Sequence, residues 1–89
     1  WLGEAMAWRL AHTYGSQSVR VLGDAASLTG LGEHFGADLY ASEVDYLRRY
    51  EWAGSAEDVL WRRTKLGLHI GGEGAARLAA YFAKAAGAD

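Results

Sequence analysis

Three basic residues in the segment 55–68 have the spacing that most favours a chemical role. Arg62, Arg63 and Lys65 follow the acidic residue Asp58 within one predicted helix. An acidic residue four positions before a basic one, as Asp58 is before Arg62, can pair with it across one helical turn. Two catalytic carboxyl groups would instead need pKa values driven apart by their surroundings. A solvated, ion-paired surface therefore explains these charges more simply than acid–base catalysis.

Arg63 differs from its neighbour Arg62 because it lies on the apolar face of the same predicted helix. Successive helical residues point about 100° apart, so the two arginines should have different partners. An unpaired charge among apolar side chains costs several kcal/mol. We therefore predict that Arg63 is a structural residue, paired with a carboxylate of the preceding helix, either Glu43 or Asp45.

The four tryptophans are a large aromatic content for 89 residues. Such rings bury a large area and keep an N–H donor at one edge, so most should lie in the core or at a contact between domains. Trp61 lies on the side of its predicted helix away from the apolar face, one turn before Lys65. We predict that Trp61, Arg62 and Lys65 form an outward-facing interface with another part of the protein.

Other patterns of reactive residues point to no site. The chain contains no cysteine, which removes disulfides, thiolate catalysis and cysteine-based zinc sites. Its three histidines show no metal-ligand spacing and no HExxH motif. The glycines at 30–36 and 71–74 lack the preceding strand that a dinucleotide-binding loop requires. We therefore expect no catalytic, cofactor-binding or metal-binding residue in this chain.

Composition narrows the class of protein further. A net charge of −2 provides no basic surface for nucleic acid. The longest apolar run is only a few residues, far from the roughly 20 that a membrane span needs. The chain begins at Trp1 rather than Met, and both ends continue directly from helical patterns. We expect one small domain, residues 1–89, that is a fragment of a longer protein.

Apolar residues recur at helical spacing throughout the chain, and no segment alternates with a period of two. The fold class is therefore predicted to be all-α, a compact bundle of about five helices with no sheet. The predicted helices cover residues 2–14, 17–26, about 38–52 or 42–52, 55–68 and 73–86. The glycine-rich stretch 28–36 is predicted to be a loop that can hold one short turn.

The predicted helix 55–68 has its own start and stop signals. Ser55, followed three residues later by Asp58, approximates a capping box that satisfies free backbone N–H groups. Gly67 stands where a left-handed residue commonly ends a helix.

The string EDVLWRRTKLG at residues 57–67 resembles part of the C-terminal helical domain of FAD-dependent, aerobic glycerol-3-phosphate dehydrogenases. The similarity spans most of the 89 residues. Asp45 departs from the family, which often carries a basic residue at that position. Upstream segments that resemble the same domain are 10–16 (LAHTYGS), 36–40 (GADLY), 42–46 (SEVDY) and 50–52 (YEW).

The resemblance implies a parent enzyme that oxidises sn-glycerol 3-phosphate to dihydroxyacetone phosphate. Such a parent passes electrons through FAD to quinone at the inner face of the bacterial cytoplasmic membrane, to which it is peripherally attached from the cytoplasmic side. The flavin and substrate regions of the family lie N-terminal to this domain, so the fragment is expected to be a non-catalytic cap without a cofactor of its own. Its expected partners are those N-terminal domains, with contacts in a homo-oligomer as a further role.

Two other functions, each from a different class of protein, are alternatives to the role of a cap domain. An autonomous helical protein-interaction module would expose a contiguous apolar patch. A helix-turn-helix DNA binder would use the basic residues 62–65 in the groove. Glu57 and Asp58 stand one turn from these residues and would repel phosphates, which argues against DNA binding.

Overall fold

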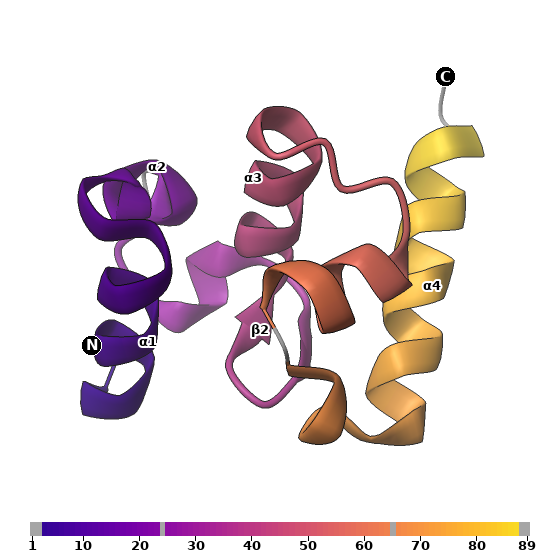
Figure 1. Ribbon diagram of the computed structural model, residues 1–89, viewed down its shortest axis with the longest axis horizontal. Coiled ribbons are helices and arrows are strands. Elements are labelled where there is room, and N and C mark those ends of the chain that lie inside the picture. The colour runs from indigo at the N-terminus through magenta and orange to yellow at the C-terminus, as the bar shows by residue number, and fades with distance from the viewer. Residues whose placement is uncertain (1–2, 24, 65, 88–89) are drawn as a thin grey trace.

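The computed structural model describes residues 3–23, 25–64 and 66–87, with side chains described as far as residue 84. Helices account for most of this structure (Figure 1). The α-helices are α1 (Glu4–Tyr14), α2 (Ser18–Leu22), α3 (Ala41–Tyr50) and α4 (Gly71–Gly87). Short elements between them are η1 (Gly15–Gln17), η2 (Leu28–Leu31), β1 (His34–Gly36), β2 (Leu39–Tyr40), η3 (Asp58–Arg63) and η4 (Leu66–Leu68).

The mostly helical class is confirmed, but the predictions of about five helices and of no sheet are wrong. The described part of the chain contains four α-helices and one antiparallel pair of strands, β1 and β2. The strands have only three and two residues, and their pairing is irregular between His34 and Gly36. Strands this short cannot show an alternating pattern, which explains why the sequence did not indicate them.

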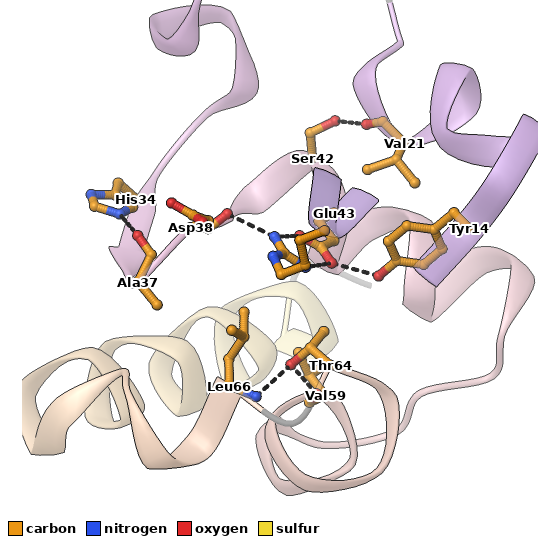
Figure 2. A network of polar contacts seen from close by, with 11 residues as sticks. Tyr14, Val21, His34, Ala37, Asp38, Ser42, Glu43, Val59, Thr64 and Leu66 are labelled. Carbon is orange, nitrogen blue, oxygen red and sulfur yellow. Dashed lines mark hydrogen bonds and ion pairs between the residues drawn. The ribbon is translucent and has the colours of Figure 1, made fainter. Parts of the chain in front are cut away.

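The predicted helix 55–68 divides into two short pieces instead of forming one α-helix. Its first part, η3, is a π-helix, in which the Thr64 N–H donates to the Val59 carbonyl, five residues earlier, at 2.9 Å. The Thr64 hydroxyl donates to the same carbonyl at 2.7 Å and accepts from the Leu66 N–H at 3.2 Å (Figure 2). The threonine side chain thus replaces the regular helical bonds, and the helix stops there.

The predicted start of this segment is confirmed and its predicted stop is wrong. The Asp58 N–H donates to the Ser55 hydroxyl at 3.2 Å, and the Gly54 N–H donates to the Asp58 carboxylate at 3.1 Å. Gly67 is not among the glycines with a left-handed backbone. The Trp61 ring lies against it instead, so close that an added Cβ would stand 2.6 Å from the ring.

The core joins every part of the fold. α3 lies between the α1–α2 pair on one side and α4 on the other (Figure 1). α4 packs closely on the hairpin, because a Cβ at Gly74 would overlap the Phe35 carbonyl oxygen. Phe35 also meets Tyr81 edge-on, with ring centroids 5.4 Å apart. The most deeply buried side chains are Leu10, Val21, Leu31, Phe35, Leu39, Glu43, Val44, Leu47, Val59 and Leu78.

Candidate functional site

A buried ionic network fixes α1 to α3. Glu43 is only 2% exposed, and the Arg9 guanidinium donates to both of its carboxylate oxygens, at 2.8 and 2.7 Å. The Tyr14 hydroxyl donates to the same carboxylate at 2.5 Å (Figure 2). Arg9 also donates to the Asp38 carbonyl at 3.0 Å, although its Nε is buried without a partner. This network holds α1 and α3 together inside the fold. Among its members, Tyr14 also lines a small cavity of about 250 Å³, together with Tyr46 and Glu51.

The electrostatics of the network favour a neutral tyrosine and a charged arginine. Burial, reinforced by the negative charge of Glu43 and the hydrogen bond to it, raises the pKa of Tyr14 above its ordinary value. Burial alone would lower the pKa of Arg9, but the hydrogen bonds and charge of Glu43 outweigh it and raise that pKa. Both side chains therefore stay in the protonation state that Glu43 requires.

The structure does not form the predicted ion pair between Arg63 and Glu43. Glu43 faces α1 and forms its ion pair with Arg9. The Arg63 guanidinium instead lies 3.5 Å from the Glu51 carboxylate on the surface. The π-helical turn of η3 rotates Arg63 away from the apolar face on which regular helical spacing would place it. The alternative partner, Asp45, instead accepts a hydrogen bond from Tyr81 at 2.7 Å.

The predicted interface residues lie on the surface where they are described. Arg62 has an 81% exposed side chain whose Nε is 3.6 Å from the Asp58 carboxylate. Trp61 is 52% exposed, with part of its ring covering Gly67. Lys65 lies outside the described residues. Both described members therefore face outward, as a contact with another domain would need.

An apolar groove of about 850 Å³ runs between α4 and the segment 53–61. Leu60, Trp61 and Phe82 supply its large side chains, and Arg48 and Glu57 its charged ones. Short side chains make up most of the remainder: Ala53, Ala56, Ala75, Ala76, Ala79 and Ala83. Because alanines keep the walls low, the groove suits the close approach of another segment of chain.

Trp52, immediately before this groove in sequence, combines backbone strain with exposure. It has φ +61° and 86% of its surface is accessible, the most among the large apolar side chains of the described part. Its left-handed turn ends α3 and lets the Ala53 N–H donate to the Leu47 carbonyl at 3.0 Å. Glycine normally takes such a position, and a bulky residue there costs on the order of 1 kcal/mol.

Sequence reasoning missed Trp52 as a surface residue. A backbone angle cannot be read from residue type, and tryptophan is a poor candidate for a left-handed turn. The one available signal was its place at the end of the predicted helix 42–52, where a glycine is common.

The described residues form neither a metal-binding cluster nor a membrane-spanning helix. None of their His, Asp and Glu side chains gather in a group of three or more that could hold a metal ion. Within the same ranges, no helix has the length and apolar character needed to cross a membrane.

Comparison with known proteins gives a consistent family. The family model described as the C-terminal domain of alpha-glycerophosphate oxidase matches residues 2–89. A glycerol-3-phosphate dehydrogenase of Pseudomonas aeruginosa is 49% identical over 82 residues, which are 92% of this chain and 16% of that protein. An aerobic glycerol-3-phosphate dehydrogenase of Escherichia coli strain K12 is 41% identical over 91% of this chain and 16% of its own length.

A third relative carries a different substrate in its name. A D-erythritol 1-phosphate dehydrogenase of Brucella abortus is 43% identical over 79% of this chain and 14% of its own length. The chain thus spans only about one-sixth of the curated relatives it matches. The resemblance to glycerol-3-phosphate dehydrogenases is confirmed. The chain belongs to the family of C-terminal domains of alpha-glycerophosphate oxidase.

Proposed function

We propose that this chain, residues 1–89, is the C-terminal cap domain of a flavin-dependent dehydrogenase. The parent enzyme oxidises sn-glycerol 3-phosphate to dihydroxyacetone phosphate with FAD and passes the electrons to quinone. The observation that carries this proposal is the 49% and 41% identity to two glycerol-3-phosphate dehydrogenases over more than nine-tenths of the chain. The parent works at the cytoplasmic membrane, attached peripherally to its inner face.

The cap itself takes no part in the chemistry. Flavin supplies the hydride transfer in such enzymes, and the rest of the polypeptide holds the flavin. The role of this domain is to pack against that catalytic part and to stabilise it. The outward positions of Trp61 and Arg62 support their assignment as contact residues. Lys65 is proposed with them from its place in the sequence.

D-erythritol 1-phosphate is a second candidate substrate of the parent. The observation that favours this substrate is the Brucella abortus relative, whose 43% identity to this chain lies between the identities of the two glycerol-3-phosphate dehydrogenases. Both candidates are phosphorylated polyols with an oxidisable hydroxyl, so one assay can compare them directly.

The test uses the full-length parent polypeptide that contains this domain. We expect the purified protein to carry FAD, and sn-glycerol 3-phosphate to bleach the flavin spectrum and reduce a soluble quinone analogue. D-erythritol 1-phosphate serves as the second arm, and the larger kcat/KM identifies the substrate. A protein without flavin, or one whose flavin neither compound reduces, would refute the proposal.

The cap role has its own test in the same enzyme. Replacing Arg62 together with Lys65 by alanine should lower thermal stability or turnover of the full-length enzyme. Arg49→Ala serves as the matched control, because Arg49 is an exposed arginine on another element, α3. Unchanged stability and unchanged turnover in the double variant would remove these residues from the contact.

A further inference from the structure

We propose that Trp52 and the apolar groove beside it dock onto the catalytic part of the same polypeptide. This surface, called here the Trp52 surface, consists of Trp52, the turn 53–55 and the groove between α4 and the segment 53–61. The inference rests on the proposed function, since it takes the remainder of the parent enzyme as the partner. It goes further by assigning the side of the domain that makes the contact.

The conformation of Trp52 is the first argument. The turn that ends α3 needs a left-handed residue, and glycine would adopt it without strain. A tryptophan makes the turn harder to form. Its ring adds little to the core in return, because 86% of the residue is exposed. Neither the turn nor internal packing therefore accounts for a tryptophan at this position, whereas contact with an apolar partner does.

The surroundings of Trp52 are the second argument. The three residues that follow it, Ala53, Gly54 and Ser55, line the groove directly. Trp61, also about half exposed, lines the same groove from η3. An exposed tryptophan next to an apolar groove of about 850 Å³ has the composition of an interface centre, in which large aromatic anchors provide most of the binding energy.

The identity of the partner follows from the size of the related proteins. The chain corresponds to about 16% of the relatives that it matches, so most of such a polypeptide lies outside these residues. Covalent attachment gives that part an effective concentration in the millimolar range, and a surface of modest area is then sufficient for docking. A second copy of the chain has no such advantage.

Photo-cross-linking in the full-length parent polypeptide tests the contact directly. The photoreactive residue p-benzoylphenylalanine replaces Trp52 in one variant and Trp8 in the control. Trp8 is a matched control because it is 64% exposed and lies on α1, across the molecule from α4 (Figure 1). We expect position 52, and not position 8, to cross-link to peptides of the same polypeptide outside residues 1–89.

Every other cross-linking pattern overturns the proposal. Links from position 52 that stay within residues 1–89 would mean that the ring has no partner in the catalytic part. A product of twice the molecular mass would mean that the surface contacts a second copy. Equal linking from positions 52 and 8 would mean that the reaction reports general proximity.

A substitution provides an independent measurement. Trp52→Gly places the preferred residue in the left-handed turn, so the domain should keep its fold, and hydrogen exchange in α3 should be as slow as before or slower. In the full-length enzyme, loss of the anchor should speed proteolytic release of the domain on the order of tenfold, with Trp8→Ala as the control. Unchanged release in Trp52→Gly would overturn the proposal.

Failure of this inference can be told apart from failure of the proposed function. Cross-linking and proteolysis require no substrate turnover, whereas the proposed function is tested by bound flavin and its reduction. A parent that oxidises a polyol phosphate but shows no cross-link from position 52 would refute the docking surface alone. A parent that cross-links as expected but holds no flavin would refute the proposed function alone.

Discussion

Arg9→Met is the substitution for which the structure predicts the largest loss of stability. The change removes the two bonds from Arg9 to Glu43, at 2.8 and 2.7 Å, and the bond to the Asp38 carbonyl at 3.0 Å. It leaves a carboxylate that is 2% exposed with the Tyr14 hydroxyl as its remaining side-chain donor. Removing one partner of a buried ion pair typically costs about 3–5 kcal/mol, because the other charge stays buried and uncompensated.

A loss of this size is a large share of the total stability of a small domain, which is about 5–15 kcal/mol. The assay is urea unfolding of the 89-residue chain, followed by tryptophan fluorescence. We expect the unfolding midpoint of Arg9→Met to fall strongly, with the slope of the transition unchanged.

The matched control replaces the whole network with apolar groups of similar size. In the triple variant Arg9→Met, Glu43→Leu, Tyr14→Phe no buried charge is left without a partner, so most of the lost stability should return. A loss below about 1 kcal/mol in Arg9→Met would show that water already screens the pair. A triple variant as unstable as the single one would show that the cost comes from lost packing instead.

Three further predictions use the same unfolding assay. Gly67→Ala should displace the Trp61 ring, because the added Cβ would stand 2.6 Å from it. We expect lower stability and tryptophan emission that is easier to quench, and unchanged quenching would contradict this prediction. Thr64→Val should cost about 1–2 kcal/mol, because its hydroxyl joins η3 to the next segment, and Thr64→Ser should lose much less. Stability should fall as pH rises above about 10. Folding raises the pKa of Tyr14 and raises the pKa of Tyr81 to about 12, so above about pH 10 the unfolded chain binds fewer protons than the folded chain. This contribution is complete below about pH 10, and Tyr14→Phe should flatten the alkaline fall.

The long helices could be predicted from the sequence because each repeats its apolar residues over several turns. α1, α3 and α4 fall within or close to the predicted ranges 2–14, 42–52 and 73–86. α2 has only five residues, where 17–26 was predicted, because so short a stretch leaves the period poorly defined. The hairpin was not predicted for a similar reason, because strands of three and two residues are too short to show alternating apolar and polar residues.

The candidate site was predictable in part. The outward positions of Trp61 and Arg62 follow from which side of a helix is apolar, and the structure places both on the surface. The partner of Arg63 could not be predicted from the sequence, because a π-helical turn changes the direction of each side chain without changing the order of residues. Trp52 was not predicted as a site residue, because its importance lies in a backbone angle that its residue type does not indicate.

The position of α4 against the hairpin affects how the chain is made. Phe35 is covered by contacts from α4 at Gly74 and Tyr81, which lie about forty positions later in the chain. During synthesis from the N-terminus, Phe35 leaves the ribosome well before the helix that shields it, so the half-made domain exposes part of its interior. A message truncated before Gly74 would therefore yield a product suited to chaperone capture and degradation rather than a smaller working domain.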